Sequence, residues 1–536
     1  MIDLKIEEGR QRENKPTRQP HNHTTTQPNN HPTMTSVEAL NRVLTAKGYA
    51  IKKSVLSEKE TRELRAELTM TPKVLDKFQR GVSSFPIYAE SKTRLYVPRQ
   101  WGIRRYGEPE ASLVPHGLPL PDTVEWNDSF TPHDFQVDII AQFQAKGSNG
   151  LICVPCGYGK TFMALRIAFE LKVRFLIIVD KEFLMNQWKA EIARFLRGAR
   201  VGILQADKVQ MDATAYDITI VMIQTLCKRE FPDAFFDQYG FTIFDECHHL
   251  GAAYFCRALQ QIQTQWMLGL SATPDREDGL SSVFEAYLGE AVYKKTQRDP
   301  DREAVVKAVW YHSEDPAYAE VPYNARGEPV TAKLLNQVAD FEPRNQRILR
   351  LIEEYTQDPR RYLLLLSDRI SQLEWFYDAL TAATAPKVSV GYYIGGMKQT
   401  LLDHNADHCQ LLLATYQMAS EAFSVKRLNT VILATPRKNV QQSTGRIFRE
   451  RMDERKVPPH IVDIIDSHDC HKRRWMVRQK FYKECQYTFV HVDRPQRGQG
   501  QGRDQGRDKG RDPEDEKDEK EEDQGCLIRL PRVSSQ

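Results

Sequence analysis

The stretch Val154-Pro155-Cys156-Gly157-Tyr158-Gly159-Lys160-Thr161 decides the fold of this chain. It follows an apolar run, residues 150–154, and precedes an apolar stretch with helical spacing, residues 162–169. Strand, glycine-containing loop and helix, in this order, are the context of a phosphate-binding loop. Gly157 and Gly159 allow successive backbone N–H groups to turn toward an anion, and the following helix adds the positive end of its dipole. The stretch therefore predicts a nucleotide site.

The side chains of this loop have separate expected roles. Lys160 would reach the β- and γ-phosphates of ATP, and Thr161 would place its hydroxyl on Mg2+. Residues 155–159 would contact the phosphates through their backbone. The full pattern has a glycine where this chain has Val154. The prediction therefore depends on partner motifs further along the chain.

Length and composition restrict the class of protein. A chain of 536 residues is too long for one core and favours two to four domains. Its 40% hydrophobic and 27% charged residues are typical of a soluble globular protein. The sequence has no apolar run of the roughly 20 residues that a membrane span needs, and its N-terminus does not resemble a secretory signal. Nine scattered cysteines do not suggest a disulfide framework, so we expect an intracellular protein.

The charge is unevenly distributed along the chain. The net charge of +3 includes residues 512–523, which hold nine acidic and two basic side chains and so carry −7. The remainder carries +10, because 3 plus 7 is 10. A basic body with an acidic tail is compatible with a nucleic-acid partner, although many other proteins share this pattern.

Composition also predicts the domain organisation. Residues 1–35 and 493–536 are polar or repetitive and predict disordered tails. Residues 36–128 predict a small α+β module, with helices over 36–44 and 57–68 and strands near 85–89 and 93–98. We expect an ATP-binding domain over 129–300, a connection over 301–340 and a second domain over 341–492.

Short apolar, β-rich runs alternate with helical stretches in both larger domains. The runs in the first are residues 175–179, 218–222, 241–244 and 266–270; those in the second are residues 362–366, 410–414, 430–434 and 461–465. This alternation is typical of parallel sheets covered by helices on both faces. The fold class is therefore α/β, with two tandem parallel-sheet domains.

An acidic pair follows one of the predicted strands, in Phe241-Thr-Ile-Phe-Asp245-Glu246-Cys-His248. Carboxylates at this position lie at the C-terminal edge of a parallel sheet, where such sheets bind ligands. Asp245 would hold Mg2+ through its water shell, and Glu246 would orient and deprotonate the attacking water. The alternative is an exposed acidic turn, which the phosphate-binding loop about 85 residues earlier disfavours.

These motifs together resemble those of superfamily-2 helicases, which have two RecA-like domains. Asp245-Glu-Cys-His248 resembles the D-E-x-H box, and Ser271-Ala272-Thr273 resembles the motif that couples hydrolysis to domain movement, in which His248 also takes part. Gln442-Ser-Thr-Gly-Arg446-Ile-Phe-Arg449 resembles the Q-x-x-G-R-x-x-R motif of the second domain. The resemblance implies that Gln442 lies at the nucleotide and that Arg446 and Arg449 serve as arginine finger and γ-phosphate sensor.

The resemblance extends to the base of the nucleotide and to a subgroup of helicases. Phe130-Thr-Pro-His-Asp-Phe-Gln136 resembles the adenine-reading segment, where Gln136 would bond the base edge and Phe130 would stack. Arg276-Glu277-Asp278 resembles an element of XPB-type DNA helicases. Gly48-Tyr-Ala-Ile-Lys-Lys-Ser54 and Leu95-Tyr-Val-Pro-Arg-Gln-Trp-Gly102 resemble helicases of large cytoplasmic DNA viruses, including the poxvirus transcript-release helicase, and the resemblance runs from about residue 45 to 490. One departure is that Ala422 and Ser424 stand where the family usually has Gly and Asp.

Nucleic acid would cross the tops of both RecA-like domains and be held mostly through phosphates. The candidate contacts are the helix over residues 183–188 with its Gln187, then Gln224 and Thr225, Ser367-Asp368-Arg369 and Thr415, together with residues 276–278. The basic stretch 472–483 predicts a helix whose outer face is solvated and whose Trp475 and Phe481 pack inward; a supplementary phosphate-binding face is the alternative.

The sequence therefore predicts a monomeric ATP- and Mg2+-dependent helicase or translocase, with DNA favoured over RNA, in viral transcription or repair. An RNA helicase and an ATP-switched scaffold that does not unwind remain alternatives. A restriction-type translocase subunit is disfavoured, because no nuclease or methyl-donor motif accompanies these motifs. If the viral resemblance holds, the protein would act where viral DNA is transcribed.

Overall fold

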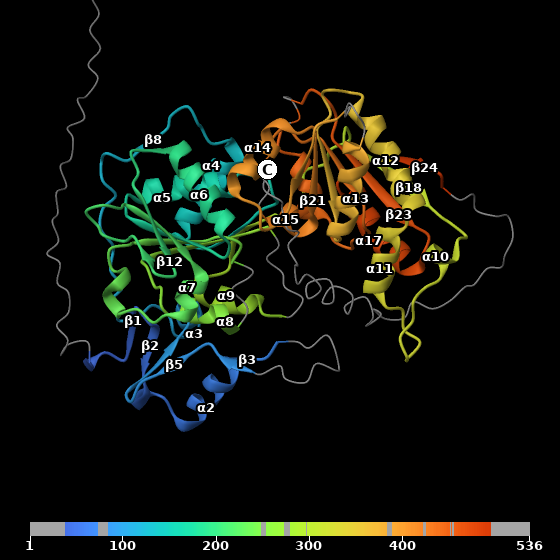
Figure 1. Cartoon of the computed structure of the whole chain (residues 1–536). Coiled ribbons are helices and arrows are strands. Elements are labelled where there is room, and N and C mark those ends of the chain that lie inside the picture. The colour runs from blue at the N-terminus through green and yellow to red at the C-terminus, as the bar shows by residue number, and fades with distance from the viewer. Residues whose placement is uncertain are drawn as a thin grey trace, which may run out of the picture.

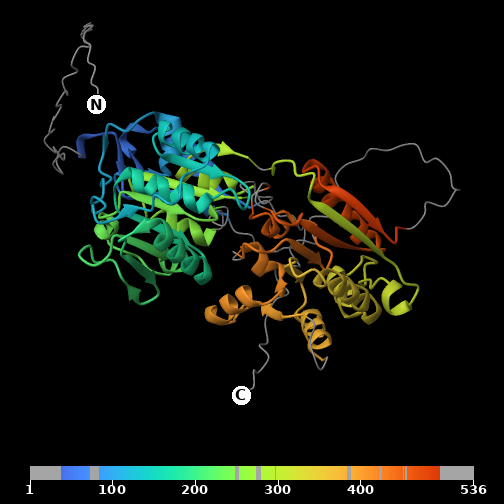
Figure 2. The same cartoon turned by 90° about the horizontal axis from the view of Figure 1, so that it is seen from above.

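The computed structural model describes residues 38–72, 84–247, 253–272, 279–295, 297–382, 388–421, 425–450, 452 and 455–494. The elements form a small N-terminal module and two larger lobes, each built on one parallel sheet (Figure 1). Seen from above, the two lobes lie beside each other (Figure 2). Both predicted disordered tails, apart from Arg494 and its neighbour Asp493, lie outside the described residues.

The sheet of the first lobe has eight strands in the order β13-β12-β14-β10-β15-β16-β9-β17. All of its strand pairs are parallel except β12–β13. The strands are β9 (Asn149–Cys153), β10 (Phe175–Val179), β12 (Val201–Gln205), β13 (Lys208–Val209), β14 (Ile218–Met222), β15 (Phe241–Phe244), β16 (Trp266–Ser271) and β17 (Ala291–Lys294). The apolar runs at 175–179, 218–222, 241–244 and 266–270 are thus confirmed as parallel strands.

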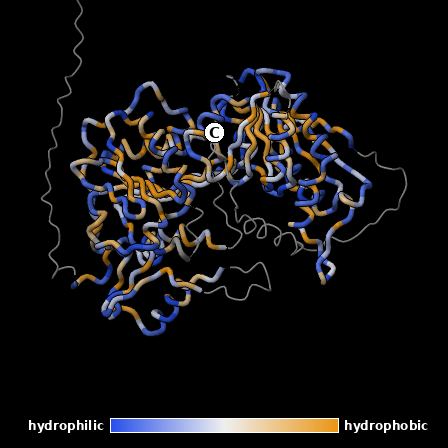
Figure 3. Tube along the Cα trace, viewed as in Figure 1, coloured by the Kyte–Doolittle hydropathy of each residue, from blue (hydrophilic) through white to orange (hydrophobic). Residues whose placement is uncertain are grey.

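Alternate residues of these strands face two different cores. Ile152 and Ile177 pack with α4 (Asp134–Ala145), α5 (Lys160–Leu171) and α6 (Glu182–Phe195) on one face. Leu151 and Leu176 pack on the other face with α7 (Ile223–Lys228), α8 (Ala253–Leu259), α9 (Ser281–Leu288) and the N-terminal module. Because both faces are covered, the strands are apolar throughout, and they form a hydrophobic centre in Figure 3.

The second sheet has seven strands in the order β20-β21-β19-β22-β23-β18-β24, and all neighbouring strands in it are parallel. The strands are β18 (Val305–Tyr311), β19 (Leu363–Ser367), β20 (Val390–Tyr393), β21 (Leu411–Thr415), β22 (Thr430–Leu433), β23 (His460–Asp466) and β24 (Thr488–Val492). One face packs on α12 (Glu342–Thr356) and α13 (Ile370–Thr381), the other on α14 (Gln399–His408), α15 (Tyr416–Glu421) and α17 (Asp469–Glu484).

The range 301–340, expected to be a connection, contains β18, α10 (Pro316–Ala319) and α11 (Thr331–Asp340). Strand β18 lies between β23 and β24, so the second sheet begins before residue 341. Helix α17 confirms the predicted helix, since Trp475 is buried and Phe481 packs against the same core. The expectation that its basic side chains are solvated is wrong for Arg474 and Arg478, which are buried; Arg478 pairs with the buried Asp463 at 2.8 Å.

The N-terminal module is a five-stranded sheet with helices, in the order β5-β6-β2-β1-β7. Its elements are β1 (Arg42–Thr45), β2 (Gly48–Lys52), α2 (Glu58–Glu67), β5 (Ala89–Glu90), β6 (Arg94–Val97), α3 (Arg99–Tyr106) and β7 (Ala111–Ser112). The expected helix over 36–44 is wrong at its end, because residues 42–45 pair with β2 on one side and β7 on the other. The capped helix is confirmed: Ser57 and Glu60 form a reciprocal capping box.

The module is tied to the first lobe by specific contacts. The buried Arg99 donates from Nη1 to the carbonyls of Thr264 and Gln265, at 2.9 and 3.0 Å. Tyr287 of α9 donates its hydroxyl hydrogen to the carbonyl of Ile87 at 2.8 Å. The module therefore sits on the α9 side of the first sheet, below the first lobe in Figure 1.

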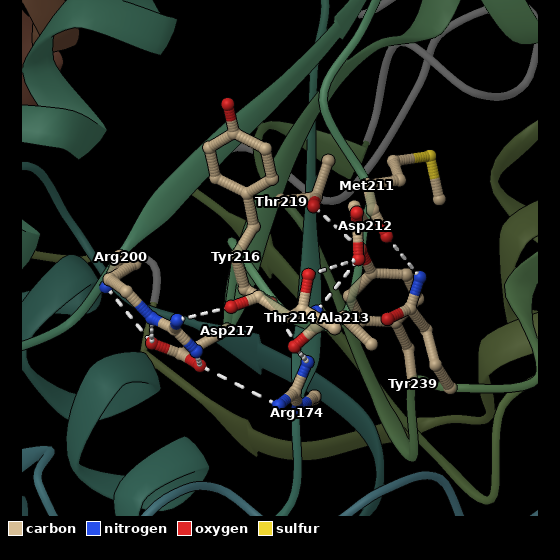
Figure 4. A network of polar contacts seen from close by, with 11 residues as sticks. Arg174, Arg200, Met211, Asp212, Ala213, Thr214, Tyr216, Asp217, Thr219 and Tyr239 are labelled. Atoms are coloured by element: carbon tan, nitrogen blue, oxygen red, sulfur yellow. Dashed lines mark hydrogen bonds and ion pairs between the residues drawn. The ribbon is translucent and has the colours of Figure 1, made fainter.

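The buried carboxylate of Asp217, directly before β14, binds two arginines at the start of that strand (Figure 4). Asp217 accepts from Nε and Nη2 of Arg200 at 2.9 and 2.6 Å and lies 3.7 Å from Nη2 of Arg174. Nη1 of Arg174 donates to the carbonyls of Ala213 and Tyr216, at 2.7 and 2.8 Å. These contacts fix the turn that leads into β14.

Among the described helices, none combines the length and the apolar character that a membrane crossing requires.

Candidate active site

The predicted phosphate-binding loop connects β9 to α5, as the sequence indicates. Gly159 is the residue before the first turn of α5 and has φ 77°, and Gly157 has φ 91°. A Cβ at Gly159 would lie 2.4 Å from Nε2 of Gln136, so a larger residue would clash there. A Cβ at Gly157 would lie 3.6 Å from the carbonyl oxygen of Phe448. The loop therefore faces the second lobe directly.

The acidic pair follows β15, the strand beside β10. The backbone N–H of Asp245 donates to the carbonyl of Ile178 at 3.0 Å, which continues the β10–β15 pairing by one residue. Nε1 of the buried Trp188, in α6, donates to Oδ2 of Asp245 at 2.8 Å. Glu246 has a positive φ of 44°, and its Oε1 lies 3.8 Å from Nζ of Lys160. The chain thus turns sharply to bring Glu246 back toward the phosphate-binding loop.

Burial and charge change the acidity of these groups. Burial, with Glu246 beside it, raises the pKa of Asp245 to about 6, although Trp188 and Lys160 oppose the rise. Burial lowers the pKa of Lys160, but the nearby Glu246, Cys156 and Asp245 outweigh it, so the pKa of Lys160 is raised overall. Lys160 therefore stays protonated, and a further cation beside Asp245 would favour its ionised form.

The second lobe contributes arginines from the turn after α16 (Gln441–Thr444). Arg446 is buried and donates from Nε to the carbonyl of Ala419 at 2.6 Å. Burial and the neighbouring Arg446 lower the pKa of Arg449 to about 10, so Arg449 remains charged at neutral pH. Lys160 and Arg446 also lower the pKa of the Cys156 thiol, against the effect of its burial.

A cavity of about 1260 Å³ brings both lobes into one site. Lys160, Thr161, Asp245 and Glu246 line it from the first lobe, and Arg446 and Arg449 line it from the second. Cys156, Gly157, Tyr158, Gly159 and Gln136 also border it. Four residues that the sequence predicted at the site do not line this cavity: Pro155, Ser271 and Ala272 of the first lobe and Gln442 of the second. The carbonyl of Ser271 accepts from the N–H of Val154 at 3.1 Å.

The segment expected to read adenine borders one end of this cavity. Gln136 is buried, accepts from the N–H of His133 at 3.0 Å and donates from Nε2 to the carbonyl of Tyr158 at 3.0 Å. Its amide thus connects the start of α4 to the phosphate-binding loop. Phe130 packs edge-on against Phe195, with ring centroids 5.0 Å apart. The more exposed Phe135 packs edge-on against Tyr158 at 5.7 Å.

The residues predicted to contact nucleic acid occupy varied positions. Gln187 lines the same cavity as Lys160 rather than a separate surface. Gln224 donates from Nε2 to the carbonyl of Asp180 at 2.6 Å, and the buried Thr225 accepts from the N–H of Ala206 at 2.9 Å. In this conformation these side chains hold together the loops that follow β10, β12 and β14.

In the second lobe, the fully buried Ser367 donates its hydroxyl hydrogen to Oε1 of Gln372 at 2.7 Å. Arg369 donates from Nε to Oδ1 of Asn336 and from Nη1 to the carbonyl of Asp368. Thr415 accepts from the N–H of Met418 at 3.4 Å. His248, Thr273, Arg276, Glu277 and Asp278, as well as Ala422 and Ser424, lie outside the described residues.

The sequence did not predict two contacts of this site. Trp188 lies 57 positions before the carboxylate that it bonds. The sequence placed its helix, residues 183–188, among the candidate nucleic-acid contacts and gave Trp188 no role beside Asp245. Arg298 lines the cavity and donates from Nη2 to the carbonyls of Cys156 and Gly445, which are 142 and 147 positions away. No local pattern identifies either contact.

A glycine-containing loop between a strand and a helix, a strand-end Asp-Glu pair and arginines from a second parallel sheet border one cavity. This arrangement is typical of ATP-hydrolysing proteins with two RecA-like lobes. Comparisons with known proteins narrow this class. A family described as "Type III restriction enzyme, res subunit" matches residues 130–276.

The chain is also similar to proteins of large DNA viruses. It is 30% identical over 453 residues to the "Putative ATP-dependent RNA helicase L396" of Acanthamoeba polyphaga mimivirus, covering 83% of this chain and 86% of that protein. It is 28% identical to the "Putative ATP-dependent RNA helicase QP509L" of African swine fever virus (strain Badajoz 1971 Vero-adapted), covering 62% and 68%. It is 26% identical to the "Putative helicase 161L" of Invertebrate iridescent virus 6, covering 63% and 77%. The chain belongs to the superfamily-2 helicases, with viral helicases as its relatives. It is an ATP-dependent enzyme that binds nucleic acid.

Proposed function

We propose that this protein is a Mg2+- and ATP-dependent DNA helicase or translocase that acts in viral transcription, at transcript release, or in repair. The observation that carries the proposal is the single cavity shared by Lys160 of the first lobe and Arg446 of the second. Nucleotide held between two lobes can change their separation, and alternating grip on phosphates then moves the protein along a strand.

The residues of the cavity fit a magnesium-bound nucleotide. Mg2+ prefers oxygen ligands, usually one or two carboxylates together with phosphates and water. The Asp245 carboxylate and the Thr161 hydroxyl offer such ligands on the same cavity. The raised pKa of Asp245 marks a buried carboxylate that an added cation would stabilise in its ionised form. Mg2+ held by these residues would neutralise negative charge on the phosphates.

The chain's own groups would perform the rest of the chemistry. Lys160 neutralises the terminal phosphates, and Glu246 orients the attacking water and accepts its proton. Arg446 and Arg449, from the second lobe, add positive charge beside the phosphoryl group, on which negative charge develops during transfer. Gln442 would contact the nucleotide from the same motif, and Ser271, Ala272, Thr273 and His248 would couple hydrolysis to lobe movement.

Two substitutions test the catalytic assignment. Lys160→Ala and Glu246→Gln should each lower ATP turnover by about 100-fold or more while the circular dichroism spectrum is unchanged. Arg302→Ala is a suitable control, since Arg302 is exposed and its side chain contacts Gln486 at 3.2 Å. Wild-type turnover in both active-site variants would refute the assignment.

The choice of DNA over RNA rests on the resemblance of residues 276–278 to XPB-type DNA helicases. An RNA helicase is the second candidate, because the mimivirus and African swine fever virus relatives carry that name. ATPase stimulation by single-stranded RNA, duplex RNA, single-stranded DNA and forked DNA separates the two. Stronger stimulation by either RNA would overturn the DNA proposal.

A scaffold that is switched by ATP without unwinding is a third candidate, which the altered Ala422 and Ser424 positions keep open. Displacement of a labelled strand from a duplex distinguishes it, because a scaffold would bind and hydrolyse without releasing the strand. We expect the protein to work as a monomer at the site of viral DNA transcription. Gel filtration with light scattering tests the oligomeric state.

A further inference from the structure

The segment between the two sheets runs directly past the phosphate-binding loop. It leaves β17, the last strand of the first sheet along the chain, and enters β18 of the second. At its start, the N–H of Lys295 donates to the carbonyl of Cys153 at 2.8 Å. The Asp299 carboxylate accepts from Nζ of Lys295 at 2.5 Å and from the hydroxyl of Tyr158. The connection is therefore attached to both sides of the loop.

Arg298 lies within this segment and contacts both lobes with one nitrogen. Its Nη2 donates to the carbonyl of Cys156 at 2.7 Å and to the carbonyl of Gly445 at 3.2 Å. An Nη2 group carries two hydrogens, so these two bonds use both of them. Cys156 belongs to the phosphate-binding loop, and Gly445 directly precedes Arg446. One NH2 group thus bridges the two motifs that would act on the nucleotide.

The surroundings of Arg298 favour a guanidinium in this position. Its central carbon lies 5.0 Å from the centroid of the Phe448 ring, which suits a planar cation. A Cβ at Gly445 would lie 2.5 Å from Nη2 of Arg298, so the absence of a side chain at residue 445 makes the approach possible. The glycine of the second-lobe motif and Arg298 are therefore complementary in shape.

Resting on the function proposed above, we propose that Arg298 is a positioning residue that holds the Arg446 motif against the phosphate-binding loop. Fixing the carbonyl of Gly445 fixes the backbone that carries Arg446, while the bond to Cys156 sets its position relative to Lys160. Because Arg298 belongs to the covalent connection between the sheets, movement of one lobe is transmitted through it to the other. Arg298 acts through the Arg446 motif and not on the phosphates themselves.

The test compares Arg298→Ala and Arg298→Lys with the control Arg302→Ala, which removes an exposed arginine of the same segment. Turnover is measured with the nucleic acid that stimulates the wild-type protein most. Loss of a charge-assisted contact predicts a fall in kcat of about 10- to 100-fold for Arg298→Ala, with KM for ATP changed by less than about threefold. Arg302→Ala should retain wild-type kcat.

Arg298→Lys keeps the charge and tests the geometry. Lysine lacks the planar group over Phe448, so this variant should remain at least about fivefold below wild type in kcat. In an Arg446→Ala background, measured under single turnover, Arg298→Ala should cause little further loss, because both changes remove the same contribution. If circular dichroism shows that Arg298→Ala does not fold, the kcat of Arg298→Lys tests the proposal instead.

Three results would overturn the role of Arg298: wild-type kcat in Arg298→Ala, wild-type kcat in Arg298→Lys, or an undiminished effect in the Arg446→Ala background. A wild-type protein that hydrolyses no ATP with any of the four nucleic acids would instead contradict the proposed function. The two failures are therefore distinguishable in one set of assays.

Discussion

Replacing Trp188 with phenylalanine should shift the pH dependence of ATP hydrolysis upward. Trp188 donates its indole N–H to Oδ2 of Asp245 at 2.8 Å, and this bond favours the ionised carboxylate. Phenylalanine keeps an aromatic ring at the buried position but has no donor. The pKa of Asp245, already raised to about 6 by burial and by Glu246, should therefore rise further.

The size of the effect follows from the energy of one hydrogen bond. A hydrogen bond to a charged group contributes about 1.5–3 kcal/mol, and one pH unit corresponds to about 1.36 kcal/mol. Asp245 acts in its ionised form, so activity is lost as the pH falls through its pKa. The acid limb of the wild-type profile should lie near pH 6, and in Trp188→Phe it should move upward by about 1 to 2 pH units.

The assay is kcat/KM for ATP against pH, because this ratio reports the ionisation of the free enzyme. Trp101→Phe is a matched control, since Trp101 donates to the carboxylate of Glu67 at 2.9 Å in the N-terminal module, away from the cavity. That variant should keep the wild-type limb. An unmoved acid limb in Trp188→Phe, with the fold intact by circular dichroism, would refute this account of the site.

Three further predictions concern stability and can be checked by urea unfolding. Arg344→Met should lower the free energy of unfolding by about 3–5 kcal/mol, because it leaves the fully buried Asp466 carboxylate without the guanidinium that contacts it at 2.6 Å. An unchanged urea midpoint would contradict this prediction. Burial lowers the pKa of His471 to about 3, below the unfolded value of about 6.5, so its neutral form is the folded one and stability falls as the pH drops below about 6.5. Between pH 6.5 and 5 the free energy of unfolding of His471→Leu should therefore fall by up to about 2 kcal/mol less than that of the wild type. Equal falls in the two proteins would show that protonation of His471 is not the cause. Asp217→Ala should lower the free energy of unfolding by about 1–3 kcal/mol. This is less than for Arg344→Met, because the side chain of Arg200, the partner of Asp217, is 45% exposed to solvent. A change within experimental error would show that the network in Figure 4 does not stabilise the fold.

Local patterns predicted the strands of both sheets well, because a strand covered on both faces must be apolar throughout. The run at residues 175–179 coincides with β10, and the run at 430–434 contains β22. Strand β18, within residues 301–340, contains Lys307 and so is not apolar throughout, but its other residues in Val305-Val-Lys-Ala-Val-Trp-Tyr311 are mostly β-branched or aromatic, which favours a strand. The helix expected over residues 36–44 failed for a different reason. Its end is held as a strand by pairing with β2 and β7, which no local preference reveals.

The candidate site likewise has some residues that local sequence patterns predict and some contacts that they do not. Lys160 and the Asp245-Glu246 pair were visible because each follows a predicted strand with a recognisable spacing. The contacts that Trp188 and Arg298 make were not visible, because their partners are distant in sequence and are backbone carbonyls or a single carboxylate oxygen. Such contacts depend on the register of whole elements against one another, which only the folded chain fixes.

The attachment of the N-terminal module matters for anyone who intends to shorten this protein. Cutting the chain before α4 would delete the guanidinium of Arg99, leaving the carbonyls of Thr264 and Gln265 without that donor, and would uncover the apolar side of α9. A fragment trimmed to the two lobes would be prone to aggregate, however complete its nucleotide cavity. Expression of the lobes alone therefore calls for polar replacements on α9.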